Sequence, residues 1–195
     1  MKKILTLAFA ASMMLLATDA FAQFHVGFGY TRTMQTAKAL SSELTGDKNG
    51  VYAGVGYTLP IAGALGITPG VYYTYSTHIT KNVATLAEHN VKGILDISYK
   101  LDLANDLAFF AFAGPRYSYG LSSTYKIDGV SETIDNYNNS FYKKGNFLLG
   151  CGVGVEFLEV VRFQVGYDHG LTNRYDSDLI SLKENMINAG ISLLF

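Results

Sequence analysis

The residues that could do chemistry in this chain are few, and the histidines come first. His78 and His89 flank one polar stretch, with Glu88 beside His89, and His169 lies near the end of an alternating apolar segment. A zinc site gathers three or four such ligands, and the spacing offers no third partner. No Ser-His-Asp or paired-carboxylate spacing occurs either. The sequence therefore predicts no catalytic, metal-binding or cofactor-binding residues.

Two further features could suggest chemistry but favour a structural interpretation. The run Gly150-x-Gly152-x-Gly154 has period two and lacks the spacing of a dinucleotide fingerprint. Cys151 is the only cysteine, so the chain cannot form an intramolecular disulfide. The formal net charge is −1 and no basic stripe is present, which argues against a nucleic-acid partner.

The N-terminal segment has the composition of an export signal. Lys2 and Lys3 precede an apolar run over residues 4–17, and Ala20-Phe21-Ala22 supplies the small-x-small pattern of a cleavage site. The run is short for a membrane-spanning anchor. We expect a signal peptide over residues 1–22 and a mature domain over residues 23–195.

The elements that must position any site are strands, because apolar residues alternate strictly with polar or small ones. Eight such segments fall at residues 24–31, 50–59, 65–75, 91–101, 107–121, 147–157, 161–167 and 187–195. Segments of about ten alternating residues are typical of membrane strands. The pattern predicts an all-β fold, an eight-stranded antiparallel up-and-down transmembrane β-barrel.

The connections between these segments alternate in length. Short links near 60–63, 102–106 and 158–160 alternate with long polar ones near 33–49, 77–90, 122–146 and 172–184. Outer-membrane barrels have short periplasmic turns and long extracellular loops, whereas a β-sandwich would present polar residues on its outer face. We therefore expect an outer-membrane location with both termini in the periplasm.

The polar face of the segments predicts the content of the barrel interior. It carries many glycines together with Lys92 and a set of charges that we expect to form a lumen network, namely Asp96, Lys100, Arg116, Glu156, Arg162 and Asp168. Counting back from a turn at Glu159 places Glu156 opposite Arg162. An eight-stranded barrel is filled by its own side chains, so these charges should pair and close the lumen. A selectivity filter or proton path is the alternative reading.

The chain end carries a sharper pattern in Asn188, Gly190, Leu193 and Phe195, with a polar residue, a glycine two positions later, and apolar residues at the third-last and last positions. It is similar to the signal that the barrel-assembly machinery recognises. The mature chain resembles small outer-membrane barrels of the OmpX/OmpA type and the PorT-like group of barrel domains. This resemblance implies membrane integration among lipid and lipopolysaccharide, assembly by that machinery, and roles from adhesion to envelope structure.

Two hypotheses about function remain open at this point. In the first, the barrel is not an enzyme, needs no cofactor, and contacts an extracellular or envelope protein through its long loops, chiefly residues 122–146. In the second, it modifies lipid A in the outer leaflet, as barrels of this size can. The deacylases among them use a His-x-Ser pair, but here the second residue after His169 is Leu171, and Thr172 follows it. The sequence favours the first hypothesis, and the narrow barrel disfavours a passive channel.

Overall fold

The computed structural model describes residues 23–39, 42–80, 84–127, 133–137, 142–175 and 180–195. The expected signal peptide lies outside the described residues. The strands are β1 (Gln23–Ala39), β2 (Ser42–Ala62), β3 (Leu65–Thr80), β4 (Ala84–Ala104), β5 (Leu107–Ile127), β6 (Thr133–Asp135), β7 (Gly145–Phe157), β8 (Val161–Gly170) and β9 (Ile180–Leu194). Within the described residues, no helix is long and apolar enough to cross a membrane.

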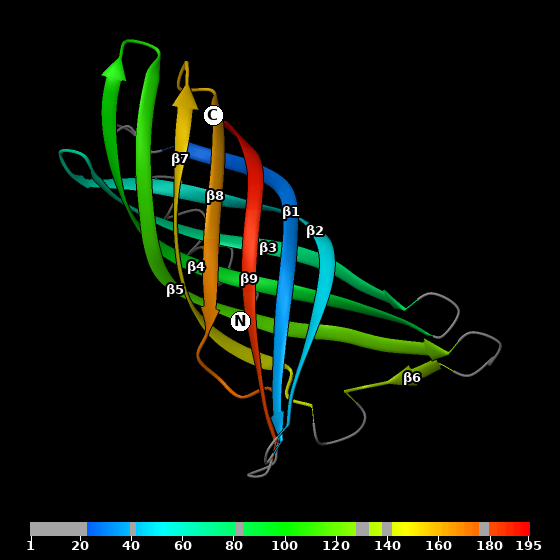
Figure 1. Ribbon diagram of the computed structural model, residues 1–195. Coiled ribbons are helices and arrows are strands. Elements are labelled where there is room, and N and C mark those ends of the chain that lie inside the picture. Colours follow the sequence, from blue (N-terminus) through cyan, green and yellow to red (C-terminus); the bar gives the residue numbers. More distant parts are fainter. Residues whose placement is uncertain (1–22, 40–41, 81–83, 128–132, 138–141, 176–179) are drawn as a thin grey trace, which may run out of the picture.

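Eight of these strands close into a ring, as Figure 1 shows. Each pairs antiparallel with its neighbours in the order β4-β3-β2-β1-β9-β8-β7-β5, and β4 pairs with β5 to complete the barrel. Strand β6 stands apart from the ring, because its three residues pair only with the far end of β5 among the described residues. The predicted eight-stranded antiparallel barrel is confirmed.

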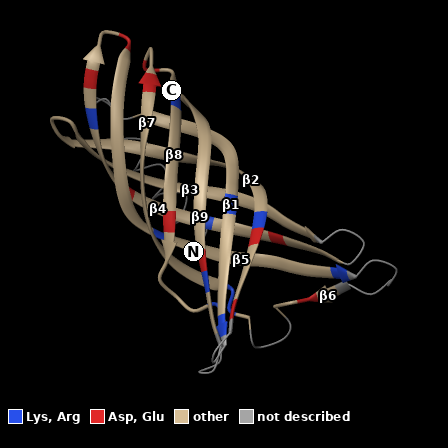
Figure 2. Cartoon of the chain, viewed as in Figure 1, with Lys and Arg blue, Asp and Glu red and all other residues tan. Residues whose placement is uncertain are grey.

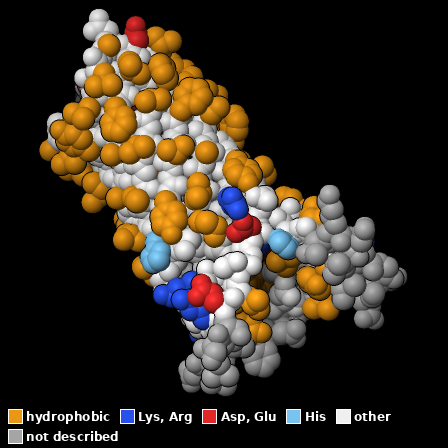
Figure 3. Space-filling view, in the orientation of Figure 1, with side chains coloured by type: hydrophobic (Ala, Val, Ile, Leu, Met, Phe, Trp, Pro, Cys, Tyr) orange, Lys and Arg blue, Asp and Glu red, His pale blue; other side chains and the backbone are white. Residues whose placement is uncertain are grey.

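The barrel is apolar outside and polar inside, the reverse of a soluble protein. Side chains alternate between the two faces of a strand, and the outward positions carry large exposed apolar residues such as Phe28, which is 54 % exposed. Apolar side chains cover much of the visible wall in Figure 3, whereas charged side chains and histidines gather toward the end with the long connections. Only a hydrocarbon environment makes such a surface favourable.

We call the two ends of the barrel the turn end, which holds the short connections, and the loop end. The strands reach beyond the apolar band at the loop end, so the expectation of long loops there is only partly right. Residues 33–49 are mostly strand, because β1 continues to Ala39 and β2 begins at Ser42. The hairpin of β3 and β4 likewise runs through most of residues 77–90. Outside the band the outward face no longer meets lipid, so the apolar alternation stops while the backbone pairing continues.

The glycine run in β7 has a packing role. Gly152 and Gly154 lie opposite Phe112 and Phe110 in the register of β5 with β7. A β-carbon at Gly152 or Gly154 would overlap these two rings, and one at Gly150 would overlap the Arg116 side chain. The absence of side chains on this stretch of β7 therefore leaves room for the bulky inward residues of β5, as a narrow barrel requires.

Candidate functional site: the lumen and its cap

The turn-end cluster comprises Lys100, Glu156 and Arg162. The tight turn at Leu158 and Glu159, both with positive φ, sets the register in which Glu156 faces Arg162. Arg162 donates from Nη2 to Glu156 Oε2 at 2.8 Å, and Lys100 Nζ donates to the other carboxylate oxygen, also at 2.8 Å. Glu156 is 1 % exposed. One buried carboxylate thus holds two cations.

The middle cluster lies further along the lumen and comprises Lys92, Asp96, Arg116 and Asp168. Arg116 reaches both acids: its Nη2 lies 3.1 Å from Asp96 Oδ2, and its Nη1 bonds to Asp168. Lys92 Nζ donates to Asp168 Oδ2 at 2.8 Å. Asp168 is fully buried. Two cations and two acids therefore balance in charge, which a buried ionic group requires.

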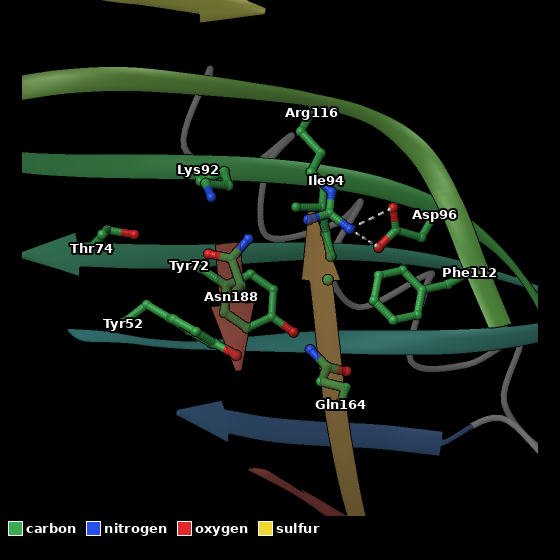
Figure 4. Close-up of a pocket in the computed structure, with 11 residues that line it drawn as sticks. Tyr52, Tyr72, Thr74, Lys92, Ile94, Asp96, Phe112, Arg116, Gln164 and Asn188 are labelled. Atoms are coloured by element: carbon green, nitrogen blue, oxygen red, sulfur yellow. Dashed lines mark hydrogen bonds and ion pairs between the residues drawn. The ribbon is translucent and has the colours of Figure 1, made fainter. Parts of the chain in front are cut away.

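The middle cluster borders a small polar cavity, drawn in Figure 4. The cavity has a volume of about 40 Å³ and lies between Tyr52, Tyr72 and the Arg116–Asp96 pair. Arg116 Nε is buried with no protein acceptor in the described part of the chain. A cavity of this volume is large enough for one ordered water.

The six charges expected to form one lumen network are all on the inward face, but they fall into two clusters. Lys100, Glu156 and Arg162 belong to the turn end, while Arg116 bonds to both Asp96 and Asp168 further along the lumen. Figure 2 shows acidic and basic positions interspersed along the strands rather than gathered in areas of one sign.

A third cluster, which sequence reasoning missed, lies at the loop end and comprises Lys48, Glu88, Arg174 and Glu184. Lys48 Nζ bonds to Glu88 and donates to Glu184 Oε1 at 2.8 Å. Arg174 Nη2 donates to Glu88 Oε1 at 2.9 Å, and its Nη1 lies 3.4 Å from Glu184 Oε2. All four side chains are 1–2 % exposed. This cluster is also neutral.

Strand parity could have found three of these four residues, namely Lys48, Glu88 and Glu184. Lys48 lies on the same face of its strand as Gly50 and Tyr52, and Glu184 on the same face as Asn188. Both fell in stretches read as loops, so the inward pattern was not extended to them. Arg174 follows β8 in an irregular connection, and no periodic signal in the sequence places it.

Two tyrosines from the connection between β5 and β7, Tyr137 and Tyr142, cover the loop-end cluster. We call these two tyrosines together with the loop-end cluster the cap. Tyr137 donates to Glu88 Oε1 at 2.7 Å, and Tyr142 donates to Glu184 Oε1 at 3.2 Å. The Arg174 guanidinium lies 4.7 Å from the Tyr142 ring centroid. A β-carbon at Gly120 would overlap the Tyr137 hydroxyl, so the cap depends on a glycine beneath it.

The cap lies beyond the apolar band, and its opposite charges stabilise each other's ionised forms. Burial alone would raise the pKa of Glu184, but Lys48 and Arg174 oppose it and lower the pKa to about 2. Burial would lower the pKa of Lys48, yet Glu184 and Glu88 hold it above its ordinary value. Burial, followed by the nearby Glu88 charge, raises the pKa of Tyr137. Glu184 therefore stays ionised and Tyr137 stays a hydrogen-bond donor at neutral pH.

The histidines considered at the outset do not form one site. His169 is exposed outward and its ring stacks with Tyr167 at 6.4 Å between centroids. His78 Nδ1 bonds to the backbone oxygen of Asp47, and His89 Nδ1 bonds to the Tyr73 hydroxyl. No group of three or more potential metal ligands occurs among the described residues.

One rim pair bears on the enzymatic hypothesis. His89 lies opposite Ser122 in the register of β4 with β5, beside a bulge. Glu88, the adjacent acid, points into the lumen and bonds there to Lys48, Arg174 and Tyr137. Glu88 is therefore not placed to orient His89 as the carboxylate of a hydrolytic triad orients its base.

The residues of the expected assembly signal occupy the last strand. Asn188 points into the lumen, where its Nδ2 donates to Asp168 Oδ2 at 3.0 Å. Gly190 lies against Tyr52, while Leu193 and Phe195 are exposed outward. The Phe195 ring lies 6.3 Å from that of Phe24, where β1 and β9 meet.

Comparison with solved structures returns other small barrels. The attachment invasion locus protein Ail of Yersinia pestis, crystallised with the heparin analogue sucrose octasulfate, has 12 % identity and a TM-score of 0.47, with 89 % of this chain and 99 % of Ail covered. Neisserial surface protein A has 15 % identity and a TM-score of 0.49, with 88 % and 97 % covered. The outer membrane enzyme PagL has 10 % identity and a TM-score of 0.42, with 85 % and 98 % covered.

A comparison with curated protein sequences gives no significant match. The outer membrane protein beta-barrel domain family, in contrast, matches residues 19–176, which is most of the chain. That match agrees with the closed ring of strands and its apolar outer wall. The chain belongs to the outer membrane protein beta-barrel domain family.

Proposed function

We propose that this protein is a non-enzymatic outer-membrane barrel with a closed lumen, which uses its loop end for adhesion, interaction or envelope structure. In this proposal the loop end faces the outside of the cell, and the turn end, with both termini, faces the periplasm. The alternation of tight turns with long strand extensions supports this orientation, because it is the arrangement of bacterial barrels.

The observation that carries the proposal is the occupancy of the lumen at three levels. The turn-end, middle and loop-end clusters cross the interior in succession, and Tyr137, Tyr142 and Arg174 cover the last of them. A conducting pore would need a continuous water path past these paired charges. Planar-bilayer recordings of the refolded protein should show no large stable conductance, and a steady porin-like current would overturn the closed-lumen proposal.

The loop end offers a surface suited to contact with another protein. Strand β2 pairs with β3 only as far as Asn49 and Thr77, whereas Ser42–Lys48 of β2 pair with β1 alone among the described residues. The unpaired side of such a strand presents backbone donors and acceptors, and an extended partner segment can add to it. Leu44, which is 72 % exposed, lies on this stretch.

Site-directed labelling tests the orientation and the contact together. In a Cys151→Ser background, a membrane-impermeant maleimide should label Leu44→Cys in intact cells, but Leu103→Cys at the turn end only after lysis. A photo-crosslinking residue at position 44 should give adducts in intact cells, and the same residue at 103 should not give those adducts. Reversed labelling would contradict the orientation, and no adduct from position 44 would contradict a contact role.

The alternative function is outer-leaflet lipid A modification, and the observation in its favour is the His89–Ser122 pair on the outer face of the rim. Mass spectrometry of lipid A from cells with and without the protein separates the two functions. We expect identical lipid A. Loss of an acyl chain that depends on Ser122 would establish the enzyme instead.

We also propose that the barrel-assembly machinery reads Asn188, Gly190, Leu193 and Phe195, and that the folded wall then contacts lipid and lipopolysaccharide. Phe195 is exposed at the chain end, where Phe24 N donates to Phe195 O at 3.2 Å. Deleting Phe195 should lower the amount of heat-modifiable barrel in the outer membrane and leave unfolded protein in the periplasm. Normal surface levels of the truncated chain would exclude this role.

A further inference from the structure

The extension that β2, β1 and β9 form at the loop end has two sides on which barrel pairing stops. Strand β8 pairs with β9 only as far as Met186, and β3 pairs with β2 only as far as Asn49. Leu44 of β2 and Leu182 of β9 both lie opposite Ala37 of β1, so they stand at the same level of the sheet. Figure 1 shows this extension diverging from β3, β4 and β5. The two sides can therefore be compared directly.

On the β9 side, the chain covers its own strand edge. Arg174 N donates to Leu182 O at 2.8 Å, and Leu182 N donates to Asn173 Oδ1 at 2.7 Å. The backbone groups of Leu182 that face away from β1 are thus satisfied by the connection that follows β8. An irregular segment of the same chain takes the place of a neighbouring strand here.

On the β2 side, no strand of the described residues covers the edge. His78 Nδ1 of β3 bonds to the backbone oxygen of Asp47, so Asp47 directs its backbone groups away from β1. Successive residues of a strand alternate in this direction, so Glu43 and Thr45 also direct theirs away from β1. The side chains of Glu43 and Thr45 are both exposed. We call the stretch from Glu43 to Thr45 the open edge of β2.

The two faces of the sheet at the open edge determine which side chains an added segment would carry. The even-numbered residues of β2 continue the inward face of the barrel, and Leu44 on this face is 72 % exposed. A β-carbon at Gly46, on the same face, would meet no atom within 4 Å. On the outward face the acids of β2 already form ion pairs with Lys38 and Arg32 of β1. The inward face thus offers an exposed apolar side chain and free space, while the outward face is neutral.

We propose that the open edge of β2 binds an extended segment of another protein, which adds as a strand antiparallel to β2. Apolar residues at two alternate positions of the segment face Leu44 and the space at Gly46, and uncharged polar residues lie opposite Glu43 and Thr45. This inference rests on the contact role proposed for the loop end, and it adds the chemistry of the partner.

A second copy of this chain does not fit the open edge within the same membrane. Antiparallel pairing of the same strand from two copies requires a two-fold axis perpendicular to the sheet. The extension continues the barrel wall, so this axis would lie in the plane of the membrane. It would turn the second barrel upside down relative to the first, which leaves a segment of a different protein as the occupant.

Proline at position 45 tests strand addition without removing a hydrogen bond of the barrel. The Thr45 N–H faces the open edge, so Thr45→Pro removes a donor that an added strand needs and that β1 does not use. Proline is tolerated at such edge positions, and heat-modifiable migration on gels checks that the variant folds. Thr45→Ala keeps the N–H and is the matched control.

The probe is a fluorescein-labelled five-residue peptide of alternating threonine and valine, added to the refolded barrel in uncharged micelles. Fluorescence polarisation should show saturable binding, with Thr45→Ala equal to the wild type and Thr45→Pro at least about tenfold weaker. The wild type should bind two altered peptides equally weakly. One is N-methylated at its threonines and cannot pair with the open edge, and the other has serine in place of valine and lacks the apolar contact.

The photo-crosslinking residue at position 44 extends the test to the partner in intact cells. Its adducts should fall at least about tenfold with Thr45→Pro and persist with Thr45→Ala. Adducts that Thr45→Pro does not reduce would leave the contact role of the loop end in place but overturn strand addition, as would adducts with the mass of two copies of this chain. Unsaturable binding of the peptide to the wild type, or equal binding of either altered peptide, would also overturn it.

Discussion

The middle cluster and the loop-end cluster have the same charge composition but are built differently. All four charges of the middle cluster come from barrel strands, whose pairing fixes their positions. The loop-end cluster takes three charges from strand extensions, while Arg174 and the covering Tyr137 and Tyr142 come from connections. The comparison suggests that the middle cluster stabilises the barrel wall as a whole, whereas the loop-end cluster chiefly holds connections in place over the mouth.

Substitution of Asp168 should have the largest effect on stability. Asp168 is fully buried and receives bonds from Arg116, Lys92 and Asn188. Asp168→Ala leaves two buried cations short of one acid, and breaking a buried ion pair this way costs about 3–5 kcal/mol. Urea unfolding of the refolded barrel should show a clearly lower midpoint. A midpoint equal to that of the wild type would mean that the middle cluster does not stabilise the wall.

Substitutions in the turn-end cluster should have a smaller effect, because water reaches part of it. Glu156→Ala removes the shared acceptor of Lys100 and Arg162 and should also lower the unfolding midpoint. The double variant Glu156→Ala with Arg162→Ala should recover part of the loss, since it removes one of the two uncompensated cations. Additive losses in the double variant would show that Glu156 and Arg162 do not stabilise each other.

The sequence predicts the charges inside the apolar band better than those of the loop-end cluster. The period of two placed Glu156 opposite Arg162 and put the six predicted charges inside, because alternation is fixed wherever one face meets lipid. The apolar alternation stops at the end of the membrane-facing band, and so Lys48 and Glu184 were taken for loop residues although their parity continues. Arg174 follows no period, since contacts between connections depend on the folded path of each.

Arg174→Ala should affect the cap more than the wall. The variant loses the bonds to Glu88 and Glu184 and the stacking on Tyr142. The connection should then open, and trypsin should cut after Lys144 several times faster than in the wild type. Cleavage after the exposed Lys126 serves as the internal reference and should not change. An unchanged rate after Lys144, or a large fall in the unfolding midpoint, would contradict the division of roles between the two clusters.

Acid should weaken the cap, because its ion pairs require the carboxylate form of Glu184. Because the pKa of Glu184 in the folded protein is about 2, below its ordinary value of 4.5, its ion pairs stabilise the cap fully above that ordinary value. This contribution is lost as the pH falls from about 4.5 toward 2. Carbon-13 NMR of the Glu184 carboxyl should show titration near the lower value in the wild type and at a higher pH in Arg174→Ala. Titration at 4.5 in the wild type would contradict a tight cluster.

The exposed ion pair between Arg32 and Asp47 should show the smallest effect, and it serves as the reference for the buried clusters. Both partners lie on the outer surface of the loop-end extension, where their side chains are 51 % and 39 % exposed. Water and salt screen such a pair, and ordering two flexible side chains offsets most of what attraction remains. Arg32→Ala and Asp47→Ala should each leave the urea midpoint and the trypsin pattern unchanged within error. A loss as large as that of Asp168→Ala would mean that the strand extensions, rather than the buried charges, determine the stability of the barrel.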